Sequence, residues 1–101
     1  MENNIKTTIE VLKQKTKSLS ILYVEDEQSL RDSTSFFLDK LFQNVEVASD
    51  GIDGLDKYLN KQYDIVITDI SMPKMNGLEL IDKIYEKKPQ QEIIIMTAHT
   101  E

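Results

Sequence analysis

Acidic and hydroxyl side chains come at the ends of three apolar runs of this sequence. They are Glu25 and Asp26 after residues 21–24, Asp69 near the end of 64–70, and Thr97 at the end of 92–97. Carboxylate oxygens are the ligands that Mg²⁺ prefers. Two carboxylates about 4 Å apart repel by about 4 kcal/mol at an effective dielectric constant near 20. Clustering therefore favours a raised carboxyl pKa or a bound cation. A bound Mg²⁺ could neutralise a phosphoryl group while an aspartate oxygen attacks it.

Short apolar runs alternate along the chain with segments of helical periodicity. Strands are predicted at 21–24, 45–48, 64–70 and 92–97, and helices at 4–17, at 28–42, from Asp50 to Leu59, and from Leu78 to before Pro89. After the first helix, strand and helix alternate with short connections. This pattern predicts an α/β fold, a doubly wound parallel sheet with right-handed crossovers. Ligands of such sheets bind at the carboxyl ends of the strands, so we expect the acidic residues and Thr97 to meet in one shallow pocket.

Each helix after the first strand carries apolar residues at helical spacing, which form a stripe along it. The stripes are Leu30, Phe37, Leu38, Leu41 and Phe42; then Ile52, Leu55 and Leu59; then Leu78, Ile81, Ile84 and Tyr85. The helix at 4–17 repeats apolar residues at helical spacing but is too short to be stable alone, so it is expected to pack on another surface.

Three segments, in this order, resemble the receiver domains of bacterial two-component response regulators. They are YVEDE, DIVITDISMPKMNG and IIIMTA, which give an acidic pair, then D-x-x-M-P-x-M-x-G, then Thr-Ala. The resemblance runs from about Leu19 to His99. It implies a flavodoxin-like receiver fold with strand order 2-1-3-4. The chain then divides into an N-terminal helical extension at 1–18 and a receiver domain at 19–101.

The resemblance implies a role for each matched residue. Asp69 is expected to accept a phosphoryl group from a sensor histidine kinase or a phosphotransfer protein. The expected Mg²⁺ ligands are Asp26, Glu25 (directly or through water), Asp69 and the backbone carbonyl of Ser71. The Thr97 hydroxyl is expected to donate to a phosphoryl oxygen and so to couple phosphorylation to a surface change. Such a domain is a signalling switch and not an enzyme, beyond assisting its own phosphoryl transfer and dephosphorylation.

The sequence departs from the family pattern at two places. The acidic pair is Glu-Asp where many relatives have Asp-Asp, which keeps the charge but lengthens one side chain. The sequence given also stops at Glu101, before the family's last helix, strand and helix, which bring a lysine to the phosphoryl group. The apolar run at 93–96 is then expected at an uncovered edge of the sheet. This predicts a homodimer or a strand-exchanged oligomer.

Composition excludes several other classes of function. The formal net charge of −6 argues against nucleic-acid binding by this segment. The sequence has no cysteine, which excludes disulfides, thiolate metal sites and cysteine nucleophiles. No apolar run approaches the roughly 18 residues of a membrane span, and the first residues lack the apolar core of a secretory signal. We therefore expect a cytoplasmic domain without membrane contact.

Other functions remain open from the sequence. An interaction module that oligomerises without being phosphorylated is one alternative. A Mg²⁺-dependent phosphohydrolase of the aspartyl-phosphate type is a weaker one, because it typically needs an acid where this chain has Ser71. A nucleotide-binding ATPase is weaker still, since no G-x-x-x-x-G-K-[ST] loop is present. Taken alone, Asp69 could also be a turn cap and Thr97 an ordinary strand residue.

Overall fold

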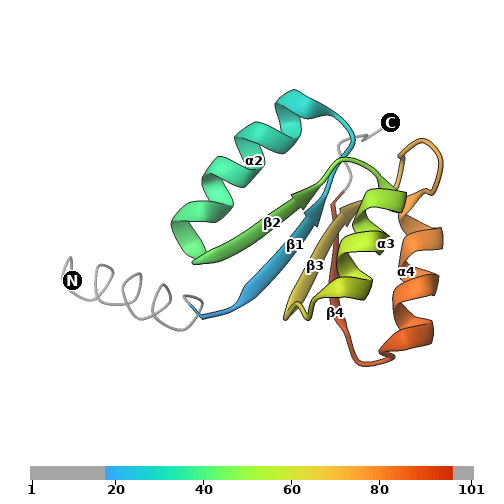
Figure 1. Cartoon of the computed structure of the whole chain (residues 1–101). Coiled ribbons are helices and arrows are strands. Elements are labelled where there is room, and N and C mark those ends of the chain that lie inside the picture. Colours follow the sequence, from blue (N-terminus) through green and yellow to red (C-terminus); the bar gives the residue numbers. More distant parts are fainter. Residues whose placement is uncertain (1–17, 97–101) are drawn as a thin grey trace, which may run out of the picture.

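The computed structural model describes residues 18–96. Labels follow Figure 1. The elements are β1 (Ser20–Val24), α2 (Gln28–Leu41), β2 (Asn44–Ala48), α3 (Gly51–Asn60), β3 (Ile65–Asp69), α4 (Gly77–Lys87) and β4 (Glu92–Met96). Every strand and helix predicted within this range is present, with ends within one or two residues of the predicted ones. The helix predicted at 4–17, the extension at 1–18 apart from its last residue, and Thr97 lie outside the described residues.

The four strands form one parallel sheet in the order β2-β1-β3-β4, as predicted. In register, Val24 of β1 lies between Ala48 of β2 and Thr68 of β3, and Asp69 of β3 lies opposite Met96 of β4. Because all strands run the same way, their carboxyl ends share one edge. That edge carries three of the residues selected from the sequence, namely Glu25, Asp26 and Asp69.

Helices cover both faces of the sheet, α2 on one and α3 with α4 on the other (Figure 1). Each face has its own apolar cluster. The cluster under α3 and α4 includes Leu22, Val24, Val66, Tyr58, Leu80 and Ile84, and the cluster under α2 is made of Ile21, Tyr23, Leu38 and Ile67. Strand β1 contributes alternate residues to both, which explains why its apolar run is continuous and not alternating.

The predicted apolar stripes are correct in part. Leu38 and Ile84 are buried, and Leu55 packs against the cluster under α3 and α4. Five other stripe residues are each at least 42% exposed: Phe37, Ile52, Leu59, Leu78 and Tyr85. The residues of α3 that are buried are Gly51, Gly54 and Tyr58. A Cβ on Gly54 would lie 2.9 Å from Val24 Cγ2, so the helix approaches the sheet along a glycine face. A stripe drawn from large apolar residues alone misses such a face, because the glycines carry no hydropathy signal.

Capping groups and close backbone contacts fix the loops at the carboxyl edge. The Asp50 side chain accepts a hydrogen bond from the Asp53 amide at 2.8 Å, and Asn76 and Glu79 form a capping box at the start of α4. A Cβ on Gly77 would lie 2.1 Å from the Asp69 carbonyl oxygen, so only glycine allows α4 to begin so close to β3. These contacts hold the turn after β3 against the start of α4.

Strand β4 forms an uncovered edge of the sheet in the described part of the chain. Ile94, Ile95 and Met96 are 49%, 47% and 38% exposed, which agrees with the predicted apolar edge. Within residues 18–96, no helix is long and apolar enough to span a membrane.

Candidate functional site at the carboxyl edge of the sheet

Glu25 enters the edge as the first residue after β1. Its amide donates to the Ala48 carbonyl at 3.0 Å, which continues the β1–β2 ladder by one bond. The residue is only 3% exposed, and its Oε2 atom accepts a hydrogen bond from the Glu27 amide at 3.1 Å. Asp26, the next residue, is exposed. The acidic pair therefore places one carboxylate inside the edge and one at its rim.

Asp69 is the last residue of β3, a strand with neighbours on both sides. It is 5% exposed, and its Oδ1 atom accepts a hydrogen bond from the Ile70 amide at 2.7 Å. That local contact is the one expected of a turn-capping aspartate. It does not account for the acidic residues gathered around Asp69, so the turn cap is only part of its environment.

The three predicted carboxylates meet in space. One oxygen from each of Glu25, Asp26 and Asp69 lies within 4.8 Å of the other two. At an effective dielectric constant near 20, two unit charges at that separation repel by about 3 kcal/mol. Among the described residues, none of the three carboxylates has an ion pair with a lysine or arginine. The cluster therefore concentrates negative charge that no ion pair within the described residues neutralises.

Burial is the main reason why the pKa of Glu25 is raised above its ordinary value. The neighbouring Asp69 and Asp26 carboxylates raise it further, and the hydrogen bond from the Glu27 amide opposes them. A divalent cation would relieve both the repulsion and the burial cost. Three hard oxygen donors with an open rim suit Mg²⁺, which keeps part of its water shell in protein sites.

Two further predicted site residues, Ser71 and Thr97, are not placed in this cluster by the described part of the structure. Ser71 lies two residues after Asp69 and is exposed, at a shallow depression that it shares with Ile70, Met72, Pro73 and Asn76. Thr97 lies outside the described residues, although β4 ends at Met96, the register partner of Asp69. The roles of Ser71 and Thr97 stay predictions.

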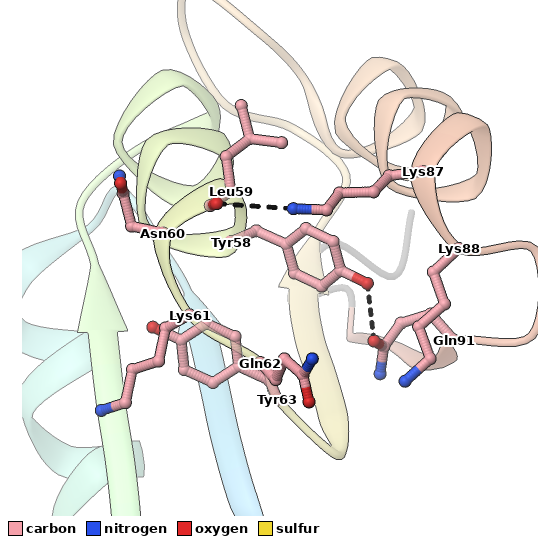
Figure 2. Close-up of a pocket in the computed structure, with 9 residues that line it drawn as sticks. All are labelled: Tyr58, Leu59, Asn60, Lys61, Gln62, Tyr63, Lys87, Lys88 and Gln91. Atoms are coloured by element: carbon pink, nitrogen blue, oxygen red, sulfur yellow. Dashed lines mark hydrogen bonds between the residues drawn. The ribbon is translucent and has the colours of Figure 1, made fainter.

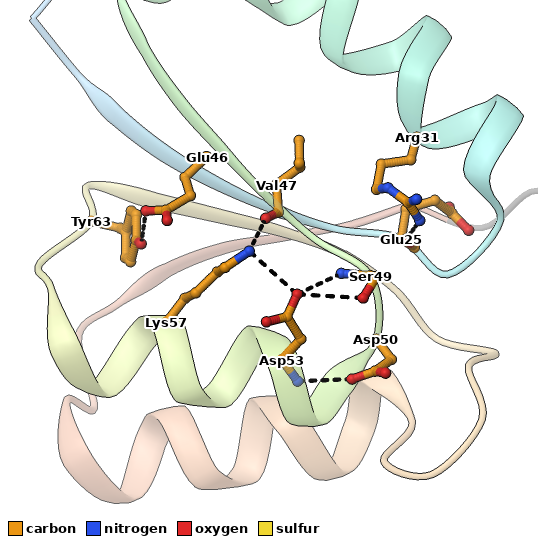
Figure 3. Close-up of polar contacts among 9 residues, drawn as sticks. All are labelled: Glu25, Arg31, Glu46, Val47, Ser49, Asp50, Asp53, Lys57 and Tyr63. Carbon is orange, nitrogen blue, oxygen red and sulfur yellow. Dashed lines mark hydrogen bonds and ion pairs between the residues drawn. The ribbon is translucent and has the colours of Figure 1, made fainter.

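Lysine and acidic side chains next to the cluster are paired with one another. Lys74 has a left-handed backbone conformation, φ 69°, and its Nζ lies 3.8 Å from Asp50 Oδ2. Lys57 donates to the Val47 carbonyl at 2.6 Å and to Asp53 Oδ2 at 3.3 Å (Figure 3). Neither lysine pairs with the cluster: Lys74 links the loop after β3 to Asp50, and Lys57 links α3 to strand β2.

Arg31 is the site residue that the sequence analysis missed. Its Nη1 atom donates to the Glu25 carbonyl at 2.8 Å (Figure 3) and approaches the Asp26 carbonyl at 3.4 Å. A signal was present, because Arg31 is the only arginine of the chain and follows the acidic pair by five residues. Its acceptors are backbone carbonyls, however, and a contact with the backbone cannot be inferred from which residue types are present.

A second polar region lies at the opposite, amino end of the strands. A cleft of about 410 Å³ opens there between the ends of α3 and α4, lined among others by Tyr58, Tyr63 and Gln91 (Figure 2). The Tyr58 hydroxyl donates to Gln91 Oε1 at 2.7 Å, and Gln91 Nε2 donates to the Asp64 carbonyl at 2.9 Å. The buried polar groups of this cleft are thus partnered within the chain.

Fold and site together define a class of protein: parallel α/β domains with a buried aspartate beside an acidic pair at the carboxyl edge. The sequence matches the response regulator receiver domain family over residues 21–101, so the chain belongs to that family. Response regulator ArlR of Staphylococcus aureus is 43% identical over 81 residues, which cover 80% of this chain and 36% of ArlR. The chain spans little more than a third of the length of the curated relatives it matches.

Solved structures agree with this assignment. The N-terminal domain of an uncharacterized protein from Wolinella succinogenes is 36% identical with a TM-score of 0.77, and the match covers 83% of this chain and 68% of that one. Response regulator TrrA of Thermotoga maritima, in complex with Mg²⁺-BeF, is 34% identical with a TM-score of 0.74, covering 81% and 71%. Chemotaxis response regulator CheY4 of Vibrio cholerae is 28% identical with a TM-score of 0.74, covering 84% and 72%.

Proposed function

We propose that this domain carries a signal as a phosphoryl group on Asp69. The observation that supports this most is the position of Asp69: a buried carboxylate at the end of an inner strand, with Glu25 and Asp26 oxygens within 4.8 Å. The donor is a phosphohistidine of a sensor histidine kinase or of a phosphotransfer protein, as membership of the receiver family suggests. The domain is thus a switch in a two-component system and not a classical enzyme.

The transfer forms one bond and breaks one. An Asp69 carboxylate oxygen bonds to phosphorus while the phosphorus–nitrogen bond of the phosphohistidine breaks, and the leaving imidazole keeps the electron pair and takes up a proton. The phosphoryl oxygens add negative charge to a cluster that already repels itself. Glu25, Asp26, Asp69 and the Ser71 carbonyl would hold Mg²⁺, which when bound offsets that charge.

Thr97 is the proposed switch residue. Its hydroxyl donates to a phosphoryl oxygen on Asp69, so the segment that carries Thr97 moves when Asp69 is phosphorylated. The support is topological, since β4 is the strand paired with β3 and ends at the residue opposite Asp69.

The test is phosphorylation by a small-molecule phosphoryl donor, read by intact mass spectrometry. With Mg²⁺, the wild-type chain is expected to gain one phosphoryl group that hydroxylamine removes, and Asp69→Asn is expected to gain none. Asp82→Asn, an exposed aspartate on α4, is the matched control and should be phosphorylated like wild type. A wild-type chain that gains no phosphoryl group with Mg²⁺, or an Asp69→Asn chain that still gains one, would contradict the proposal.

The exposed β4 edge favours a second candidate, an interaction module that pairs with a second copy of the chain. An apolar edge strand with free backbone donors and acceptors recruits another strand. Sedimentation of the 101-residue chain at high concentration should then show a dimer or larger oligomer, and Ile94→Lys should shift it to monomer. Ile52→Lys, the same change at an equally exposed isoleucine on α3, should leave the oligomer unchanged. A monomeric wild-type chain would rule this candidate out.

A further inference from the structure

The guanidinium of Arg31 connects helix α2 to the backbone of the acidic pair. It bonds the Glu25 carbonyl at 2.8 Å (Figure 3) and lies 3.4 Å from the Asp26 carbonyl. A single side chain thus spans both peptide units. Both contacts come from Nη1, which carries two N–H groups and can donate one to each carbonyl. The contact is therefore specific to the backbone path of residues 25–26.

Few other contacts hold this turn. Glu27 is the N-cap residue of α2 and makes no side-chain capping bond, and α2 has no acidic residue in its first turn. Glu25 is tied at its amide to Ala48, and the Glu27 amide binds back to the Glu25 side chain. Arg31 thus provides the side-chain link between the described part of α2 and the carbonyls of the acidic pair.

The position of Arg31 is unfavourable for a cation on its own. It is the fourth residue of α2, close to the positive end of the helix dipole. A cation there is stabilised only if its hydrogen bonds offset the dipole, and the two carbonyls of the acidic pair are acceptors that can do so. The hydrogen bonds to the Glu25 and Asp26 carbonyls therefore explain why an arginine lies in the first turn of α2, where the helix dipole disfavours it.

We propose that Arg31 is a positioning residue for the metal site: it fixes the backbone of Glu25 and Asp26 so that both carboxylates stay directed at Asp69 and at the cation between them. The inference rests on the proposed function, because it assumes that this cluster binds Mg²⁺. In metal sites, residues that hydrogen-bond the metal ligands typically hold those ligands in place. Removing such a residue commonly weakens metal affinity 10- to 100-fold.

Charge repulsion between Arg31 and Mg²⁺ would change Mg²⁺ affinity in the opposite direction. A guanidinium near a cation site repels the cation, so charge alone predicts that removing Arg31 would tighten Mg²⁺ binding. The geometry argues that positioning dominates, because Nη1 is directed at the two carbonyls and not at a carboxylate.

The experiment measures Mg²⁺ affinity by amide NMR titration of the 101-residue chain. Arg31→Met, which keeps an apolar stem and removes the donors, is expected to raise the Mg²⁺ Kd about tenfold. Arg31→Lys keeps the charge but replaces the planar guanidinium with one ammonium group, and it should raise the Mg²⁺ Kd about threefold. Lys83→Met, an exposed lysine on α4, is the matched control for net charge and should stay within about twofold of wild type.

A second measurement needs no metal. In the metal-free protein, Arg31→Met is expected to shift the amide signals of Glu25 and Glu27 and to speed exchange of the Glu27 amide. Unchanged signals and exchange, or an unchanged or lower Mg²⁺ Kd in Arg31→Met, would overturn the inference. A wild-type chain that binds no Mg²⁺ would instead refute the proposed function, and the metal-free measurement would still decide whether Arg31 holds the turn.

Discussion

Buried polar groups are hydrogen-bonded to one another at one end of the sheet and are like-charged carboxylates at the other. At the amino end, Tyr58, Gln91 and Asp64 form a chain of hydrogen bonds between neutral groups, each donor facing an acceptor. At the carboxyl end, Glu25 and Asp69 are 3% and 5% exposed, yet they face each other and Asp26 as like charges. The first arrangement stabilises the fold, and the second costs stability until a cation or a proton arrives.

This difference separates a part of the chain that stabilises the fold from the part proposed to bind a cation. Buried hydrogen bonds that are fully satisfied make the fold more rigid, whereas unbalanced buried charge is a common feature of functional sites. The amino end also ties elements together: Gln91 precedes β4, Asp64 precedes β3, and the Asp64 carboxylate accepts from the Ser20 amide of β1 at 2.7 Å. Substitutions at the two ends should therefore change stability in opposite directions.

The largest effect is expected at the amino end, for Gln91→Leu. The side chain is 4% exposed, and its loss leaves the Tyr58 hydroxyl and the Asp64 carbonyl without their partner. A buried polar group without a partner costs about 1 to 3 kcal/mol, so we expect the free energy of unfolding to fall by about 3 kcal/mol. Urea denaturation measures it, with Gln62→Leu on the exposed rim of the same cleft as control, expected within about 0.5 kcal/mol of wild type.

The Mg²⁺ affinity of Gln91→Leu should stay at the wild-type value wherever the variant is folded. If it falls together with stability, the two ends are coupled and the contrast between them fails. If Gln91→Leu is as stable as wild type, water replaces the lost partner and the amino end is not the stabilising one.

Periodicity and chain order predicted the part of the site that depends on topology. The apolar runs at 21–24 and 64–70 identify parallel strands, and parallel strands bring Glu25, Asp26 and Asp69 to one edge whatever the packing details. Contacts between distant polar groups were beyond such a prediction. Gln91 meets Tyr58 across 33 residues, and Arg31 meets carbonyl groups whose direction depends on the path of a turn.

The same limit explains why part of the predicted stripes is exposed. Hydropathy marks large apolar residues, so the predicted stripe of α3 was Ile52, Leu55 and Leu59, and of these Leu55 packs against the core while Ile52 and Leu59 are exposed. The closeness of α3 to the sheet depends on the absence of a side chain at Gly54, where a Cβ would come within 2.9 Å of Val24. A residue that acts by leaving space is recognised only after the neighbouring backbone has been placed.

A smaller effect of opposite sign is expected at the carboxyl end, for Glu25→Gln in the metal-free protein. The glutamine keeps the shape and removes one of three like charges, so we expect the free energy of unfolding at neutral pH to rise by on the order of 1 kcal/mol. Glu86→Gln, an exposed acid on α4, is the control and should have no such effect. Urea denaturation in the presence of a chelator measures both, and a Glu25→Gln variant less stable than wild type would contradict the contrast between the two ends.

The pH dependence of the free energy of unfolding tests the same prediction more specifically. Burial and the neighbouring carboxylates raise the pKa of Glu25 in the folded protein above the ordinary value of 4.5 that it has when unfolded. Between these two values the folded protein holds more protons than the unfolded one, so the wild-type free energy of unfolding falls as pH rises. Glu25→Gln lacks that slope. Its advantage should be absent below about pH 4.5, grow as pH rises through the folded pKa of Glu25, and then stay level. Saturating Mg²⁺ should reverse the order at neutral pH, because a cation bound by the wild-type cluster adds stability that the variant cannot fully recover.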